Sequence, residues 1–129
     1  MRRALLGLLC VAALVSCSTD SGQDAEPAPA LDYVALGDSG ASGPLIPQST
    51  GTAGCLQSDS NYPHVLAGLI GARSFVDVSC SGARSENIAA EAQSTNSGPI
   101  PLQIDALSEE TDLVTMTIGG NDVDLVSRV

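Results

Sequence analysis

A short apolar run that passes directly into a tight polar turn constrains this chain more than any other feature. Tyr33 to Leu36 is uniformly apolar, which is typical of a strand buried on both faces of a sheet. Gly37 breaks the run, and Asp38 and Ser39 are residue types that favour a helix N-cap. A serine just past a buried strand also stands where open α/β sheets build their sites. The stretch therefore supports two interpretations, a helix cap or part of a functional site.

The other apolar segments predict an α/β fold. The runs at 74–79 and 112–118 indicate a second and a third strand. Helical spacing predicts a helix over 62–70 and a short helical patch over 86–93, and a further helix is expected to start within 123–129. Because strands alternate with helical segments, the order favours a parallel, doubly wound sheet.

Each predicted strand ends in a turn of small polar residues. These turns are Gly37-Asp38-Ser39-Gly40, Cys80-Ser81-Gly82-Ala83 and Gly119-Gly120-Asn121-Asp122. The carboxyl ends of parallel strands share one edge, so we expect the turns to meet in one crevice. There Ser39 would attack an acyl group, while the backbone N–H groups of Ser39 and Gly82, with the Asn121 amide, would face the developing oxyanion.

The composition excludes several function classes. The formal net charge is −10, from 5 basic and 15 acidic residues, so nucleic acid is not expected as a partner. The chain contains no Lys, which excludes a P-loop lysine and a Schiff-base lysine. Aromatic residues make up only 2%, so the core must consist of aliphatic side chains.

The N-terminus has the features of an export signal. Arg2 and Arg3 precede an apolar run over 4–15, which is shorter than the roughly 20 residues of a spanning helix. We interpret residues 1–16 as a signal peptide. Leu14-Val15-Ser16-Cys17 resembles the bacterial lipobox, which implies a lipid on Cys17 and a membrane anchor; the alternative is an ordinary secretory signal.

Three segments follow from this interpretation: the signal peptide at 1–16, a lipid-anchor cysteine with a flexible polar linker at 17–31, and a folded domain at 32–129. The protein is expected to be exported, either as a membrane lipoprotein that faces outward or as a secreted protein.

Two cysteines remain in the predicted domain, Cys55 and Cys80. In an oxidising compartment they are expected to form a disulfide that pins the Gly- and Ser-rich surface loop over 44–61. The alternatives are two separate thiols or metal ligands. Zinc is disfavoured because the spacing is wide and the chain has a single histidine, His64.

The three turns also carry a family resemblance. Gly37-Asp38-Ser39, Gly82 and Gly119-Gly120-Asn121-Asp122 resemble the first three blocks of the SGNH hydrolases, or GDSL-type esterases and lipases. Tyr33 to Ser39, Asn61-Tyr62-Pro63 and Cys80 to Ala83 are similar to the secreted actinobacterial branch, and Cys55 and Cys80 match a disulfide of that branch.

The resemblance implies a flavodoxin-like, three-layer α/β/α fold with strand order 2-1-3-4-5. It also implies hydrolysis of acyl or acetyl esters through an acyl-enzyme, with no metal or organic cofactor. The nucleophile would be Ser39, and the oxyanion hole would be formed by Ser39, Gly82 and Asn121. The residues that would support these turns are Gly37, Asp38, Gly119, Gly120 and Asp122.

The chain departs from the family pattern in two ways. Gly40 stands where the family usually has a large residue. No Asp-x-x-His block occurs in the 129 residues, and His64 does not carry that motif. We therefore expect the N-terminal part of an esterase, truncated after the third strand, inactive by itself, and with that strand as an exposed edge.

Other interpretations fit the residues less well. The α/β-hydrolase elbow requires a final Gly, whereas Ala41 stands at that position. Asp122-x-Asp124 lacks the later residues of a calcium loop, so we interpret Asp122 as a helix-start residue. The alternative function, from a different class, is a non-catalytic surface lipoprotein that binds a ligand or partner through the same crevice.

Overall fold

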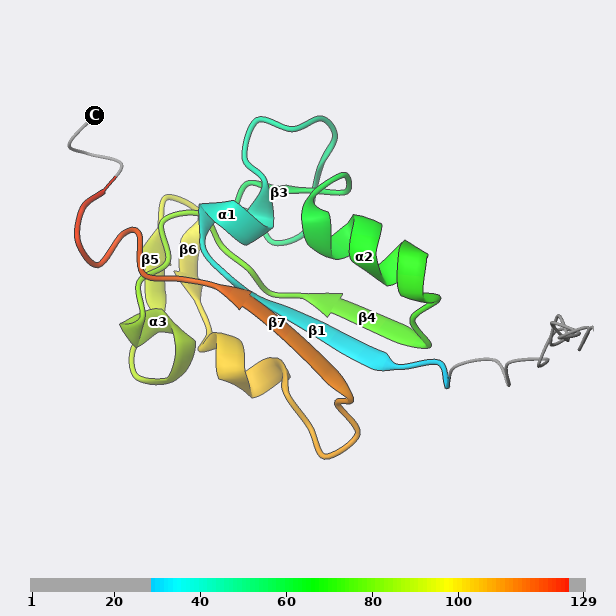
Figure 1. The fold of residues 1–129 in the computed structure, drawn as a ribbon. Helices are drawn as coiled ribbons and strands as arrows, with labels where there is room; N and C mark the ends of the chain where they lie inside the picture. The colour runs from blue at the N-terminus through cyan, green and yellow to red at the C-terminus, as the bar shows by residue number, and fades with distance from the viewer. Residues whose placement is uncertain (1–28, 126–129) are drawn as a thin grey trace, which may run out of the picture.

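A three-stranded parallel sheet forms the centre of the computed structural model, which describes residues 29–125. Its strands are β1 (Asp32–Gly37), β4 (Ser74–Asp77) and β7 (Leu113–Thr117), in the order β4-β1-β7 (Figure 1). Tyr33 lies opposite Phe75 on one side and opposite Leu113 on the other. The predicted parallel sheet is confirmed, and its order matches the first three strands that the resemblance implied.

Helical segments lie on both sides of this sheet, as Figure 1 shows. The helix α2 (Tyr62–Ile70) covers one face, and α3 (Glu86–Ala89) and the 3-10 helix η1 (Gln103–Ala106) lie on the other. The central strand β1 is buried from Tyr33 to Gly37, because it has a neighbour on each side and a layer above and below. The three-layer arrangement is thus confirmed for the part that the structure describes.

Local sequence signals set the ends of α2. The Asn61 side chain caps the helix by accepting a hydrogen bond of 3.0 Å from the His64 N–H. Pro63 lies in the first turn, where its missing N–H costs nothing. At the other end Gly71 adopts a left-handed conformation (φ 59°) and donates to the last carbonyls. The helix occupies the predicted residues.

Several connections differ from the prediction. The loop over 44–61 contains a short hairpin of β2 (Ser49–Thr50) and β3 (Gln57–Ser58). A second hairpin, β5 (Gln93–Thr95) and β6 (Gly98–Ile100), begins where the helical patch over 86–93 was expected to end. That patch is therefore shorter than predicted.

The prediction of a helix that starts within 123–129 is wrong for the residues that the structure describes. Gly120 to Leu125 form turns, and Asp124 has a φ of 51°, which interrupts a right-handed helix. Asp122 is not a helix-start residue either, because its carboxylate accepts hydrogen bonds from Ser85. Residues 126–129 lie outside the described part, as do the predicted signal peptide, Cys17 and most of the linker.

An ion-pair cluster fastens the opposite edge of the sheet, where the strands begin. The Arg73 guanidinium donates to Asp32, with Nε 2.9 Å from Oδ1, and to Asp112, with Nη2 3.2 Å from Oδ2. The hydrogen bonds from Arg73 and Ser74 hold the pKa of Asp32 below its usual value. The three strands are therefore linked by charge at their amino ends.

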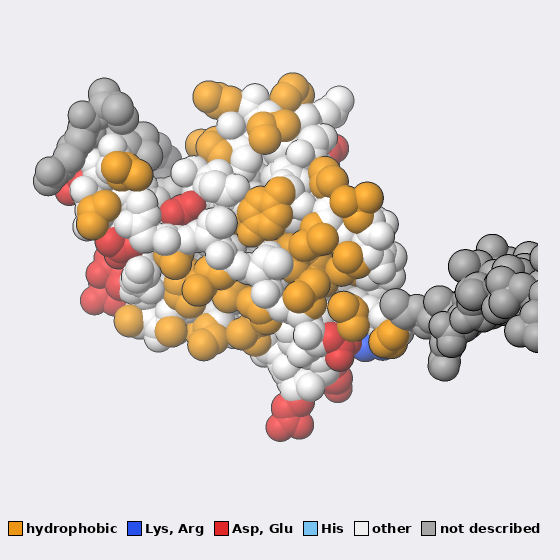
Figure 2. Space-filling view, in the orientation of Figure 1, with side chains coloured by type: hydrophobic (Ala, Val, Ile, Leu, Met, Phe, Trp, Pro, Cys, Tyr) orange, Lys and Arg blue, Asp and Glu red, His pale blue; other side chains and the backbone are white. Residues whose placement is uncertain are grey.

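Within residues 29–125, β7 pairs with β1 alone, so its other side is a sheet edge. Val114 and Met116 are 43% and 52% exposed there. Figure 2 shows hydrophobic side chains gathered over the region of β7 and η1. The expected exposed edge is therefore present. Among the described residues, no helix is both long and apolar enough to cross a membrane.

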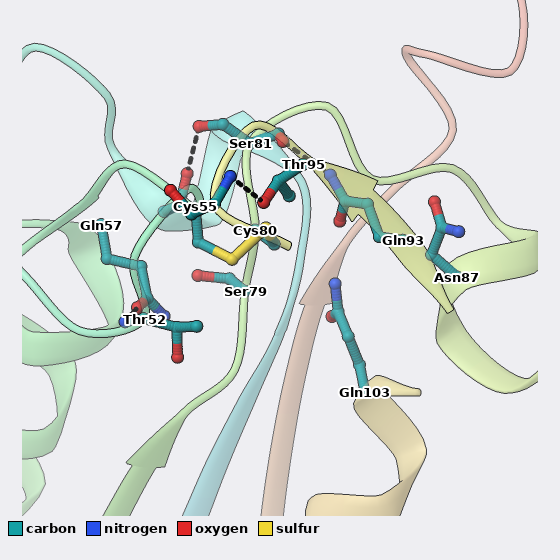
Figure 3. Close-up of a disulfide and its surroundings, with 12 residues drawn as sticks. Thr52, Cys55, Gln57, Ser79, Cys80, Ser81, Asn87, Gln93, Thr95 and Gln103 are labelled. Carbon is teal, nitrogen blue, oxygen red and sulfur yellow. Dashed lines mark hydrogen bonds between the residues drawn. A yellow bond between two sulfur atoms is a disulfide. The ribbon is translucent and has the colours of Figure 1, made fainter. Parts of the chain in front are cut away.

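The predicted disulfide is also confirmed. Cys55 and Cys80 are bonded, and both are buried (Figure 3). The bridge ties the loop over 44–61 to the turn that follows β4, and the Ser81 N–H reinforces it by donating to the Cys55 carbonyl at 3.0 Å.

We expect reduction of this disulfide to lower the free energy of unfolding by about 3 kcal/mol, because it frees a loop of 25 residues in the unfolded state. Urea unfolding with and without reductant measures the change. Alkylation before reduction is the control, since it should modify neither cysteine. Equal unfolding midpoints in the two conditions would contradict the prediction.

Candidate active site

The turn after β1 caps a short helix and is hydrogen-bonded to the end of the neighbouring strand β7. Asp38 caps the short helix α1 (Ser39–Ser42) by accepting from the Gly40 N–H at 2.9 Å. Its own N–H donates to the Thr117 carbonyl of β7 at 2.8 Å. The helix-cap interpretation is therefore confirmed for Asp38. Ser39 becomes the first residue of α1, at the carboxyl edge of the sheet.

Ser39 carries unused hydrogen-bonding groups. Its side chain is partly exposed, and within residues 29–125 neither its hydroxyl nor its N–H has a hydrogen-bond partner. Gly40, the next residue, is exposed, and a Cβ there would lie 3.3 Å from Asp38 Oδ1. A side chain at position 40 would therefore start in close contact with Asp38 and Thr117.

Gly37 fixes the direction in which this turn leaves the sheet. Its φ of 136° is one that L side chains rarely adopt, and a Cβ would lie 2.4 Å from the Thr117 carbonyl oxygen. The buried amide of Gln103 pairs with both backbone groups of Gly37: Oε1 accepts from the N–H at 2.6 Å, and Nε2 donates to the carbonyl at 2.9 Å. The Cys80 N–H donates to the same carbonyl at 2.9 Å.

The turn after β4 lies directly beside α1. The hydroxyl groups of Ser42 and Ser81 are 2.7 Å apart, so the helix that begins with Ser39 contacts the residue before Gly82. Gly82 has a φ of 83° and is exposed. Its N–H has no acceptor among the described residues. The backbone N–H that the sequence singled out is therefore free to bind a ligand.

The turn after β7 completes the edge. The Asn121 amide Nδ2 donates to the Ala83 carbonyl at 2.8 Å, which uses one of its two hydrogens. The Asp122 carboxylate accepts from the Ser85 N–H at 3.0 Å and from its hydroxyl at 3.1 Å. A Cβ at Gly120 would lie 3.9 Å from Asp38 Oδ2, and Gly119 adopts a positive φ of 112°. The structure thus brings the three predicted turns together.

His64 belongs to a different network. Its Nδ1 lies 2.8 Å from Asn61 Oδ1 and 3.7 Å from Asp77 Oδ2. Asn61 in turn donates to that carboxylate at 2.8 Å. The ring also contacts Phe75 edge to face, and in the described part it has no hydrogen bond to Ser39. The one histidine of the chain therefore fastens α2 to the sheet.

Two cavities adjoin the edge. One of about 520 Å³ borders Ser81 and Gly82, and polar residues of α3, of β5 and of the segment between them line much of its wall. The other, of about 290 Å³, lies against the disulfide and Gln103, with Val78, Ile100 and Leu102 in its wall. Neither of these two cavities is lined by Ser39. A hydroxyl and backbone N–H groups that have no partner among residues 29–125, at one edge of a sheet, are the groups that acyl transfer requires.

The sequence did not reveal two side chains that hold this edge together, Gln103 and Gln93. Gln103 acts across 66 positions in the sequence, and Gln93 donates to the Ser81 carbonyl from β5 at 2.8 Å. Neither lies in a motif, because a buried polar partner leaves no local pattern.

Comparison with known proteins gives consistent matches. The sequence model of the GDSL-like lipase/acylhydrolase family matches residues 35–128. Lipase 2 of Streptomyces coelicolor is 47% identical over 108 residues, which cover 81% of this chain and 35% of the relative. The lipase of Streptomyces rimosus is 34% identical over 116 residues, which cover 89% of this chain and 39% of the relative. The chain thus spans little more than a third of the length of these curated relatives.

Solved structures show the same likeness. The phospholipase A1 of Streptomyces albidoflavus NA297 superposes with a TM-score of 0.63 at 33% identity, over 77% of this chain and 38% of that one. The extracellular lipase of Streptomyces rimosus gives a TM-score of 0.61 at 33% identity, over 76% and 38%.

We predict that Gln103→Leu lowers the free energy of unfolding by about 2 kcal/mol, because it leaves the buried N–H of Gly37 without an acceptor. Urea unfolding of the variant measures this. The matched control is Gln48→Leu at an exposed position, which should change the midpoint little. A Gln103→Leu midpoint equal to that of the control would contradict the assigned role.

Proposed function

Because the chain belongs to the GDSL-like lipase/acylhydrolase family, we propose that it supplies the nucleophile and the oxyanion hole of a serine ester hydrolase. This membership confirms the SGNH resemblance found in the sequence. The observation that carries the proposal is a set of groups at one sheet edge that have no hydrogen-bond partner among residues 29–125: the Ser39 hydroxyl and the N–H groups of Ser39 and Gly82. The similar Streptomyces proteins are lipases by name, which supports an ester as substrate.

In the proposed reaction, Ser39 Oγ attacks the carbonyl carbon of an acyl or acetyl ester and the alcohol leaves, which forms an acyl-enzyme that water then hydrolyses. The negative charge that develops on the carbonyl oxygen would be bound by the N–H groups of Ser39 and Gly82 and by the second hydrogen of the Asn121 amide. No metal or organic cofactor enters this scheme.

The attack also requires a base to accept the proton of Ser39. His64 is engaged with Asn61 and Asp77, so it is not placed for this task. We propose that an Asp-x-x-His block supplies the base, and these 129 residues do not contain one. Residues 1–129 by themselves are therefore expected to be inactive toward esters.

A second candidate is a non-catalytic surface protein that binds a ligand through the same crevice. The cavity of about 520 Å³ supports it, because this cavity borders Gly82 at one end of the crevice, although Ser39 does not line it, and binding there needs no base. The two candidates differ in whether any rate depends on Ser39.

We predict that imidazole, added as an external base, gives the purified protein a Ser39-dependent rate with p-nitrophenyl butyrate. A positioned base contributes about 10²–10⁴-fold, and free imidazole should recover a small part of that. The control is Ser39→Ala in the same buffer, which reports hydrolysis by imidazole alone.

Equal rates for the two proteins would contradict Ser39 as the nucleophile, and ligand-dependent stabilisation in that case would favour the binding candidate. Turnover without imidazole that Ser39→Ala abolishes would instead show that a base is already present.

We further propose that the protein is exported and held at the membrane by a lipid on Cys17. The extracellular lipase of Streptomyces rimosus supports export, and the lipobox-like Leu14-Val15-Ser16-Cys17 supports the lipid. The domain would then face esters outside the cell.

This proposal predicts that cells fed labelled palmitate incorporate the label into the wild-type protein and not into Cys17→Ala, because only the thiol of residue 17 would receive the lipid. Immunoprecipitation and autoradiography measure the incorporation. Equal labelling of both proteins would contradict lipidation of Cys17, and no label in either would leave an ordinary secretory signal.

A further inference from the structure

Gln93 is a buried amide with only half of its hydrogen-bonding capacity used. It lies on β5 and is 8% exposed. Its Nε2 donates to the Ser81 carbonyl at 2.8 Å, whereas its Oε1 is buried with no partner in the part of the chain described. Figure 3 shows the side chain reaching toward the Ser81 turn. An unpaired buried acceptor is destabilising, so the amide adds little net stability.

The bond that Gln93 makes acts on the peptide that contains the proposed oxyanion donor. The Ser81 carbonyl and the Gly82 N–H belong to one planar peptide group, and the cis bond found in the described part lies elsewhere, at Pro47–Gln48. In a trans peptide the C=O and N–H point in opposite directions. When Gln93 holds the carbonyl on the β5 side, the N–H must point away from β5.

The backbone of Gly82 needs a contact of this kind to hold its peptide in one orientation. It has no Cβ and a φ of 83°, so its backbone has unusual freedom to rotate. A Cβ built there would meet only the Gln93 Nε2, at 3.6 Å. The turn itself is closed by the Ala83 N–H, which donates to the Cys80 carbonyl at 3.0 Å, but neither group belongs to the Ser81–Gly82 peptide. The Gly82 N–H itself has no acceptor among the described residues. Without Gln93, nothing on the β5 side fixes the plane of this peptide.

A second contact, from α1, also holds Ser81 in place. Ser81 also contacts α1 through its hydroxyl, 2.7 Å from that of Ser42, three positions after Ser39 in the sequence. Gln93 is held in place by pairing of β5 with β6, where it lies opposite Ile100. The Ser81–Gly82 peptide is therefore clamped between the helix that carries Ser39 and a hairpin from the other side of the turn.

We propose that Gln93 is a positioning residue, which holds the Ser81 carbonyl and thereby aims the Gly82 N–H at the oxyanion. The inference rests on the proposed function of Ser39 and Gly82, but its structural part can be tested without any turnover. It differs from a purely structural role in one respect: removal of the amide should change the Gly82 peptide and leave the stability nearly unchanged.

The first test is amide NMR of the purified protein carrying Gln93→Met, which keeps the length of the side chain and removes both polar atoms. The Gly82 N–H signal should shift or broaden and exchange faster with solvent, while the signal of Gly119 and the unfolding midpoint stay close to wild type. Gln48→Met, at an exposed position, is the matched control and should change none of these.

A second variant tests the donor itself. In Gln93→Glu the carboxylate cannot donate to the Ser81 carbonyl, whereas the protonated carboxyl can. The Gly82 signal should therefore be displaced at neutral pH and return toward its wild-type position on acidification, in a range above that of a free glutamic acid because the site is buried. A merely structural role would not produce this recovery.

The imidazole-supported, Ser39-dependent rate gives the functional readout. Loss of one oxyanion donor costs about 10²–10³ in kcat, so a misdirected donor in Gln93→Met should lower kcat by about tenfold or more with little change in KM. An unchanged Gly82 signal in Gln93→Met, or a general shift of all signals with a lower unfolding midpoint, would overturn the proposal. If the wild type shows no Ser39-dependent rate, the proposed function fails, and the NMR result still decides the role of Gln93.

Discussion

The backbone of Gly37 is the constraint on which the rest of the candidate site depends. Its carbonyl accepts from the Gln103 amide and from the Cys80 N–H, and its own N–H donates to Gln103. One residue later, Asp38 donates to Thr117. The end of the central strand is thereby joined to β7, to η1 and to the turn that follows β4. The chain can leave the sheet in only one direction, and that direction places Ser39 at the edge.

Neutral side-chain amides make many of the hydrogen bonds that hold the backbone at this edge of the sheet. Gln103 holds Gly37, Gln93 holds Ser81, Asn121 holds Ala83, and Asn61 donates to the Ser42 carbonyl at 3.2 Å. An amide can satisfy a buried carbonyl without the desolvation cost of a charged group. The ion pairs of Arg73 and Arg84 are by contrast exposed. Asp38 is the exception at this edge, because its buried carboxylate lies next to Ser39 and accepts from the Gly40 N–H at 2.9 Å.

The sequence predicted those parts of the structure that have a local cause. The buried run of β1, the caps of α2 and the Cys55–Cys80 pair each follow from residues close together or from simple counting. The two hairpins were missed because strands of two or three residues carry no alternating pattern. The helix expected within 123–129 failed where Asp124 adopts a positive φ, which sequence periodicity does not report. Gln93 and Gln103 were missed because their partners are 12 and 66 positions away.

The candidate site separates two parts of acyl transfer, the binding of the oxyanion and the activation of the nucleophile. The donors that would bind the oxyanion are held by contacts among the three turns and α1 and by Gln93 of β5, and none of these contacts involves a histidine. The base that would activate Ser39 has no place in that network, because His64 serves α2. Preorganised donors contribute to catalysis independently of proton transfer, since they act on the charge of the carbonyl oxygen and not on the nucleophile. The proposed oxyanion donors can therefore be held in place by the three turns and by Gln93 without any contact to the base.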